Sequence, residues 1–233
     1  MAGVRLEHVS REYHMGKTVI KAVDDISFTI PEGTYTIILG ASGAGKSTVL
    51  NILGGMDSPT SGKVFVNEKE ISGFNKRQLT QYRRESIGFV FQFYNLMPNL
   101  TVQENVELAS QICKNPLDAR EVLNMVGLDD RRRNFPAQCS GGEQQRGAIA
   151  RALAKNPDVL LCDEPTGALD YVTGKSILAL LYDLCKQSKK TVVVVTHNGA
   201  LAPTADVLIR MKSGKIESFA ENPNPVPVQE LEW

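Results

Sequence analysis

Short, continuous apolar runs alternate with longer amphipathic stretches along this chain. YTIIL at 35–39, VLLC at 159–162 and TVVVV at 191–195 each have the length of one strand. Such runs are typical of strands in a parallel sheet that helices cover on both faces. Between the last two runs, SILALLYDLCKQ at 176–187 has apolar residues at helical spacing. The pattern predicts an α/β fold with a parallel central sheet.

The N-terminal part of the chain has an alternating pattern instead. Apolar and polar residues alternate over 4–9 and again over 26–30, and KVFVN at 63–67 is a further candidate strand. Alternation of this kind is typical of strands with one buried face. We expect short strands that form an antiparallel sheet at the edge of the core.

Helical spacing dominates the middle of the chain. It is visible over 75–85 and over 100–125, where β-branched runs are few, so we expect an α-helical sub-domain over approximately 93–157. The last segment, 221–233, is rich in proline and is expected to be a solvated tail. The alternative is that Leu231 and Trp233 dock on a partner or on the domain itself.

Composition narrows the class of protein. A chain of 233 residues can bury the core of one globular unit. Lys and Arg together number 26 and Asp and Glu also 26, so the charge gives no reason to expect nucleic acid as a partner. No CxxC pair is present, which argues against a zinc site or disulfide framework and favours a reducing cytosol. The four cysteines are Cys113, Cys139, Cys162 and Cys185.

The apolar runs are also too short for a membrane span, which needs about 20 residues. Charged residues interrupt the first segment, MAGVRLEHVSREYH, throughout. We therefore expect neither a transmembrane helix nor a signal peptide.

A phosphate-binding loop is the strongest chemical motif. GASGAGKS at 40–47 matches GxxxxGK[ST] and lies between the strand at 35–39 and a helical stretch, KSTVLNILGGM. Glycines let the backbone N–H groups face phosphate oxygens, Lys46 adds a positive charge, and Ser47 offers a hydroxyl to Mg²⁺. A glycine-rich turn without a ligand is the alternative.

Two carboxylates follow the apolar run at 159–162. The strand delivers Asp163 to the carboxyl edge of the sheet, where α/β proteins bind ligands, and Glu164 comes next. Asp163 is suited to the metal or its waters, and Glu164 to activating or orienting an attacking water. Alone, the pair would be interpreted as solvated acids at a strand end.

A second glycine motif, CSGGEQQR, occupies 139–146. Ser140 and Glu143 form the S-x-x-E capping box that starts a helix, and apolar positions follow on one face. Most capping boxes have no further meaning. Here the motif stands in a fixed order: the phosphate loop, SGGEQQR, the Asp-Glu pair, and then a strand that ends in Thr196 and His197.

In that order, these motifs resemble the nucleotide-binding subunit of an ABC transporter over about 4–217. The resemblance implies a P-loop NTPase (RecA-like) core with an antiparallel β edge sheet and an inserted α-helical sub-domain, all within an ATP-binding domain at 1–220. Residues 40–47 would be the Walker A loop, 140–144 the signature, and 167–170 the D-loop. Cys139 stands where the signature usually has leucine, and Gly167 where the D-loop usually has serine.

The resemblance also implies roles for single residues. Catalysis would fall to Glu164, His197 and Gln92, and Mg²⁺ would be bound by Ser47, Gln92 and Asp163. Tyr13 lies where the family places an aromatic residue that stacks on adenine. The residues that would bind ATP are Tyr13, Gly40, Ala41, Ser42, Gly43, Ala44, Gly45, Lys46, Ser47, Thr48, Ser140, Gly141, Gly142, Gln144 and Asp170.

Two copies of such a subunit would lie head to tail in an ATP-dependent homodimer. The signature of each copy would close over the γ-phosphate held by the other, and hydrolysis would reopen the pair. The aromatic and apolar cluster GFVFQFYNLMPNLT, 88–101, would supply core residues and a groove for a helix of a membrane partner.

Sequence details such as DEPTGALD look most similar to the branch of macrolide exporters, lipoprotein-release ATPases and the cell-division ATPase. That branch implies a peripheral protein on the cytoplasmic face of the membrane and a separate permease of the FtsX type, which moves amphiphiles, peptides or lipoproteins. A non-transport ABC ATPase of cell division or DNA repair is an alternative. So is a phosphate-loop kinase or GTPase, which would need neither SGGEQQR nor His197.

Overall fold

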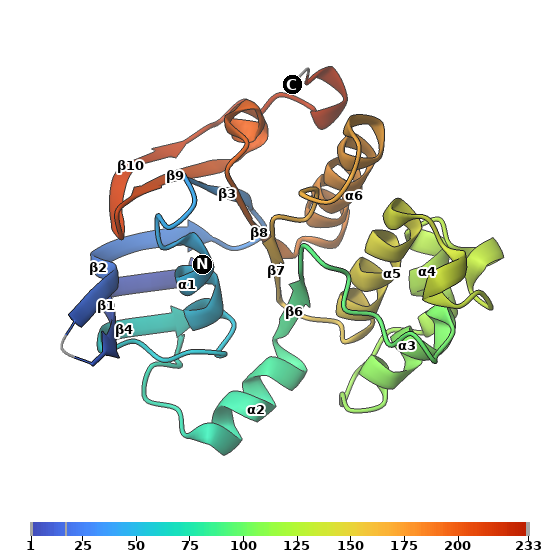
Figure 1. Ribbon diagram of the computed structural model, residues 1–233, viewed down its shortest axis with the longest axis horizontal. Coiled ribbons are helices and arrows are strands. Elements are labelled where there is room, and N and C mark those ends of the chain that lie inside the picture. Colours follow the sequence, from blue (N-terminus) through green and yellow to red (C-terminus); the bar gives the residue numbers. More distant parts are fainter. Residues whose placement is uncertain (1, 17, 232–233) are drawn as a thin grey trace.

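The computed structural model describes residues 2–16 and 18–231 (Figure 1). Its strands form two sheets, of four and six strands. The strands are β1 (Ala2–Met15), β2 (Thr18–Pro31), β3 (Tyr35–Leu39), β4 (Ser61–Val66), β5 (Lys69–Glu70), β6 (Ile87–Val90), β7 (Val159–Asp163), β8 (Thr191–Thr196), β9 (Val207–Lys212) and β10 (Lys215–Glu221). The α-helices are α1 (Lys46–Leu53), α2 (Lys76–Glu85), α3 (Val102–Ser110), α4 (Ala119–Met125), α5 (Gly141–Ala154) and α6 (Tyr171–Ser188). None of the described helices is long and apolar enough to cross a membrane.

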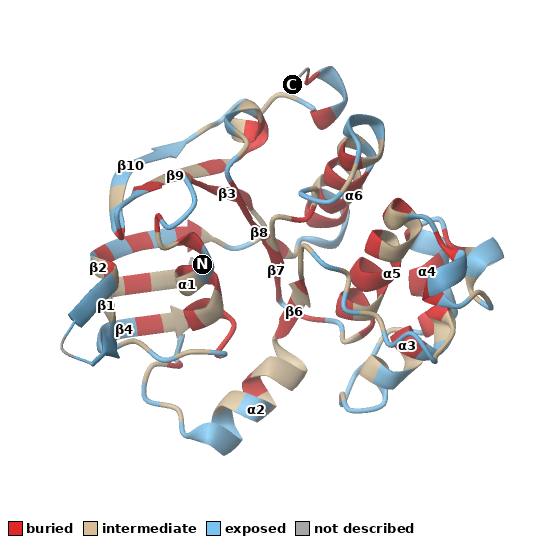
Figure 2. Ribbon diagram, in the orientation of Figure 1, coloured by how far each residue is buried: buried red, intermediate tan, exposed pale blue. Residues whose placement is uncertain are grey.

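The six-stranded sheet is the centre of the molecule. Its strand order is β10-β9-β3-β8-β7-β6, and all neighbours are parallel except β10, which runs antiparallel to β9. Alternate residues of β8 face opposite cores: Val192 and Val194 pack with α5 and α6, whereas Val193 and Val195 pack with α1 and the other sheet. Burial on both faces explains why these strands are continuous apolar runs (Figure 2).

The four-stranded sheet, ordered β2-β1-β4-β5, is antiparallel as expected. The prediction of short strands is wrong here, because β1 and β2 are each 14 residues long. Pairing continues to the end of the hairpin, where Met15 lies opposite Thr18. The outer half of β2 is exposed, so it carries no apolar alternation that the sequence could have revealed.

Three α-helices of the described chain, α3, α4 and α5, lie between residues 93 and 157, and Figure 1 shows them together at one end of the molecule. Each of these helices begins after a residue whose side chain caps its N-terminus. The side chains of Thr101, Asp118 and Ser140 each accept a backbone hydrogen bond at the start of one of these helices. The boundary of a separate sub-domain at 93–157 stays a prediction.

The proline-rich segment packs against the domain, so the expectation of a solvated tail is wrong. A 3-10 turn, η4 (Val228–Glu230), places Val228 at 1% and Leu231 at 7% exposure against the core that includes α6. The carbonyl of Leu231 accepts hydrogen bonds from Tyr171 Oη at 3.2 Å and Lys175 Nζ at 2.6 Å. Burial of Val228 and Leu231, together with the two hydrogen bonds to the Leu231 carbonyl, outweighs the preference of the prolines for an extended, solvated chain. Trp233, also named in the docking alternative, lies outside the described residues.

Removal of the Leu231 side chain is therefore expected to destabilise the fold. Leu231→Ala should lower the free energy of unfolding by about 2 kcal/mol, the low end for a leucine that leaves a cavity. Urea unfolding followed by circular dichroism measures the change. Gln229→Ala, at an exposed position of the same segment, is the control. A loss below about 0.5 kcal/mol for Leu231→Ala would show that the docked segment contributes little.

Candidate active site

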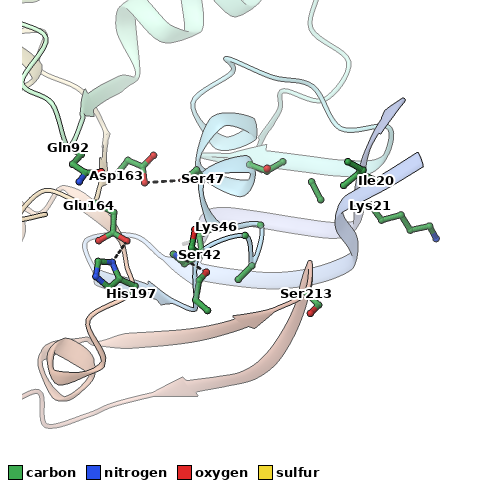
Figure 3. Close-up of a pocket in the computed structure, with 16 residues that line it drawn as sticks. Ile20, Lys21, Ser42, Lys46, Ser47, Gln92, Asp163, Glu164, His197 and Ser213 are labelled. Carbon is green, nitrogen blue, oxygen red and sulfur yellow. Dashed lines mark hydrogen bonds and ion pairs between the residues drawn. The ribbon is translucent and has the colours of Figure 1, made fainter. Parts of the chain in front are cut away.

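A cavity of about 1110 Å³ lies at the carboxyl ends of β3, β7 and β8 (Figure 3). It brings together most of the residues that the sequence predicts for nucleotide binding. Gly40 borders a neighbouring hollow instead. The lining residues are Ile20, Lys21, Ala22, Ala41, Ser42, Gly43, Ala44, Gly45, Lys46, Ser47, Thr48, Gln92, Asp163, Glu164, His197 and Ser213.

The loop between β3 and α1 wraps around the start of the helix. Gly45 is the N-cap of α1 with φ of 96°, and a Cβ there would lie 2.3 Å from the carbonyl oxygen of Ala22. Only glycine fits that position. Lys46 is buried, and its Nζ donates to the carbonyls of Gly40 at 2.7 Å and Ala41 at 3.0 Å. A helix N-terminus and a buried ammonium inside one loop suit a phosphate group.

Asp163, at the end of β7, meets Ser47, in the first turn of α1. Ser47 Oγ donates to Asp163 Oδ1 at 3.2 Å. Burial raises the pKa of the Asp163 carboxyl above its ordinary value and the nearby Glu164 carboxylate adds to the rise, while the Ser47 hydrogen bond opposes it. A hydroxyl and a partly buried carboxylate are the oxygen ligands that Mg²⁺ prefers, so these residues fit that ion.

Glu164 is held by three contacts with β8 and the residue after it. Its Oε1 lies 2.9 Å from His197 Nδ1, its Oε2 accepts from Thr196 Oγ1 at 3.1 Å, and its backbone N–H donates to Val195 O at 2.9 Å. Its φ of 46° lies in the left-handed region, which a glutamate adopts only when its surroundings enforce it. The carboxylate and the imidazole are thus oriented together at the cavity wall, as Figure 3 shows.

Gln92 comes from the loop after β6 and reaches the same cavity. Its side chain lies on Gly167, where a Cβ would be 2.8 Å from Gln92 Nε2. Glycine at position 167 leaves room for this contact. The loop that carries Gln92 and the loop after Glu164 therefore touch beside the cavity.

Tyr13 is not among the cavity-lining residues. It lies opposite Ile20 in the β1–β2 hairpin, and Ile20 does line the cavity. The hydroxyl of Tyr13 donates to Asp57 Oδ2 at 2.7 Å, and the Arg11 guanidinium lies 4.7 Å from the ring centroid. The adenine-stacking role of Tyr13 stays a prediction.

The signature residues also lie outside this cavity. Ser140 caps α5: its Oγ accepts from Glu143 N at 3.3 Å, and its N–H donates to Glu143 Oε2 at 2.7 Å. Gly141 and Gly142 form the first turn of that helix, and Gln144 Nε2 donates to Cys139 O at 3.0 Å. The predicted capping box is confirmed, and this second helix N-terminus is not among the groups that line the cavity of the phosphate loop.

Asp170 is likewise the N-cap of a helix, α6, and is not among the cavity-lining residues. Its Oδ1 accepts from Thr173 N at 3.0 Å. A hydrogen bond from the Thr173 side chain, together with this backbone bond, lowers the pKa of the Asp170 carboxyl. Asp170 is thus fixed at the surface by its own helix, and its predicted role in ATP binding stays a prediction.

Four cavity residues have no signal in the sequence. Ile20, Lys21 and Ala22 belong to β2, and Ser213 lies in the turn between β9 and β10 with φ of 49°. They reach the cavity because Asp24 N donates to Gly214 O at 2.9 Å, which joins the two sheets beside the phosphate loop. Only the tertiary fold brings these segments together.

Comparisons with known proteins agree with this site. The family model described as ABC transporter matches residues 23–167. An uncharacterized ABC transporter ATP-binding protein of Thermotoga maritima is 47% identical over 221 residues, covering 93% of this chain and 94% of that protein. The macrolide export ATP-binding/permease protein MacB of Brucella melitensis is 42% identical over 226 residues, covering 94% of this chain and 35% of MacB.

Solved structures of ATP-binding cassettes are also similar to this chain. A dimeric structure of the ATP-binding cassette MJ0796 in a post-hydrolysis state, bound to ADP and Pi, superposes with a TM-score of 0.85 at 42% identity. The match covers 94% of this chain and 98% of that one. The chain spans half the length of a relative from Mycoplasma pneumoniae to which it is 42% identical. With the phosphate loop, the paired carboxylates and the histidine in one cavity, the chain belongs to the ABC transporter family and is an ATP-binding, ATP-hydrolysing subunit of that family.

Proposed function

We propose that two copies of this chain close head to tail over ATP and Mg²⁺ and thereby drive a separate membrane permease. One observation carries the proposal: the cavity holds the phosphate loop, both carboxylates, Gln92 and His197, whereas Ser140 and the N-terminus of α5 lie outside it. In a two-fold dimer each copy presents the same surfaces to its partner, so the N-terminus of α5 of one copy would complete the cavity of the other. The dimeric state of the MJ0796 cassette supports this arrangement.

Within one chain, Lys46 and the N–H groups of the loop would bind the phosphates. Ser47, Asp163 and Gln92 would hold Mg²⁺, which neutralises phosphate charge when bound. Glu164 orients the attacking water and accepts its proton, and His197 holds that carboxylate in place at 2.9 Å. Reaction therefore requires that the backbone after β7 keeps Glu164 aimed into the cavity.

The second copy would supply the γ-phosphate contacts. Ser140 Oγ and the N–H groups of Gly141 and Gly142, in the first turn, stand at the positive end of the 14-residue helix α5. They would attract the nucleotide-bearing partner while the terminal phosphate is present. Hydrolysis cleaves the β–γ bond, and the charge that they bind leaves when the phosphate is released. ATP binding would thus close the dimer, and loss of phosphate after hydrolysis would reopen it.

A permease would dock beside Gln92. Phe93 is 72% exposed and Met97 is 51% exposed on the loop that follows β6, so apolar side chains stand in water next to the residue that reaches the nucleotide cavity. The ATP-binding/permease composition in the name of MacB supports a membrane partner. The proposed cargo is an amphiphile, a peptide or a lipoprotein. The chain would then lie on the cytoplasmic face of the membrane.

Docking is tested by a pull-down from detergent-solubilised membranes. The chain is expected to retain an integral membrane protein, and Phe93→Asp combined with Met97→Asp is expected to lose it, because burying two carboxylates in an apolar interface is costly. Met125→Asp, at an exposed methionine of α4, should retain it. A wild-type chain that retains no membrane protein would favour the non-transport ABC ATPase instead.

A further inference from the structure

We propose that Gln145 is a positioning residue that fastens the backbone beside Gln92 and the backbone beside Glu164 to helix α5. The inference rests on the roles proposed above for those two residues. Gln145 lies five residues after Ser140 in helix α5, and its side chain points into the domain with 0% exposure.

One amide group makes both contacts. Gln145 Nε2 donates to Pro165 O at 2.8 Å and to Phe91 O at 3.4 Å. Pro165 directly follows Glu164, and Phe91 directly precedes Gln92. A single NH₂ group thus bonds to the two chain segments that carry the proposed base and the proposed magnesium ligand.

Those segments need such support. Glu164 holds a left-handed backbone at φ of 46°, and Pro165 has no N–H to contribute to a neighbouring hydrogen bond. The Pro165 carbonyl is the group through which the segment is anchored to α5. On the other segment, the Phe91 ring stacks on Phe89 with centroids 4.4 Å apart, and the bond from Gln145 fixes the carbonyl at that point.

The amide oxygen of Gln145 indicates that this side chain does more than stabilise the fold. Gln145 Oε1 is buried and has no hydrogen-bond partner in the described part of the chain. An unsatisfied buried acceptor is costly, and an apolar side chain of similar length would avoid that cost. What an apolar side chain lacks is the pair of N–H donors. The gain from those donors is therefore expected in the placement of Gln92 and Glu164, rather than in the stability of the fold.

The decisive variant is Gln145→Met, which keeps the length and removes both donors. Its kcat for ATP hydrolysis is expected to fall at least about tenfold, while KM and the ATP dissociation constant stay within about twofold, because the phosphate loop is untouched. Gln103→Met, which removes an amide that donates to Glu107 within α3, is the matched control and should keep the wild-type kcat.

A folded Gln145→Met protein with wild-type kcat would overturn the inference, as would a parallel rise in KM. If that variant does not fold, Gln145→Glu replaces it. The glutamate has the same shape and at most one hydrogen to donate, so its kcat should be reduced, and a wild-type value would overturn the inference. Glu164→Gln is measured in parallel: turnover by that variant would contradict the proposed function, whereas its inactivity beside an active Gln145→Met would contradict only the role of Gln145.

Discussion

Glu164→Gln is expected to lower kcat for ATP hydrolysis by at least about a hundredfold, the low end of what a general base contributes. The amide keeps the shape of the side chain and its contact with Thr196, but it cannot accept a proton from water. ATP binding should persist, because the phosphate loop and Lys46 are unchanged. The variant should therefore accumulate as an ATP-bound dimer.

Phosphate release under saturating ATP and Mg²⁺ measures the loss of turnover, and equilibrium binding of a fluorescent ATP analogue measures affinity. Glu221→Gln, at an exposed position of β10, removes a carboxylate away from the cavity and is expected to behave as wild type. If Glu164→Gln hydrolysed ATP at half the wild-type rate or faster, another group would have to activate the water.

Lys46→Ala is expected to weaken ATP binding itself. Lys46 is 7% exposed, and its ammonium lies 2.7 Å and 3.0 Å from two carbonyl oxygens of the loop. From there a rotation of the side chain would bring the ammonium to a phosphate bound in the loop. A hydrogen bond to a charged group contributes about 1.5–3 kcal/mol, so its loss should raise the ATP dissociation constant by one to two orders of magnitude.

A calorimetric titration with ATP and Mg²⁺ checks this value. Lys76→Ala, at the exposed start of α2, is the control and should leave the dissociation constant unchanged. An unaltered dissociation constant for Lys46→Ala would remove Lys46 from phosphate binding and leave the backbone N–H groups as the main ligands.

The central sheet was predictable because its strands are buried on both faces. YTIIL and β3 share the bounds 35–39, and the apolar run at 159–162 begins with β7, which ends one residue later at Asp163. The same logic placed Asp163 and Glu164 at the carboxyl edge of the sheet. The phosphate loop was also predictable from the sequence, because a strand, a glycine-rich loop and a helix follow one another directly.

Contacts between distant segments were not predictable. Gln145 bonds to backbone groups 54 and 20 residues away, and nothing local distinguishes it from Gln144. Three prolines indicate an extended tail, but they do not reveal that Val228 and Leu231 fold back on the core. The cavity residue Ser213 similarly depends on how a β-turn meets β2.

The proposed dimer is tested most directly at Ser140, which caps its own helix and in that dimer would contact the phosphate held by the partner. Asp and Asn cap helices as well as Ser does, so Ser140→Asp adds a negative charge opposite the γ-phosphate without losing the cap, and Ser140→Asn is its neutral control. Both are made in the Glu164→Gln chain and examined by sedimentation velocity with ATP and Mg²⁺. We expect the Asp variant to bind ATP and stay monomeric, whereas the Asn variant dimerises. Equal dimerisation of the two would contradict the head-to-tail site.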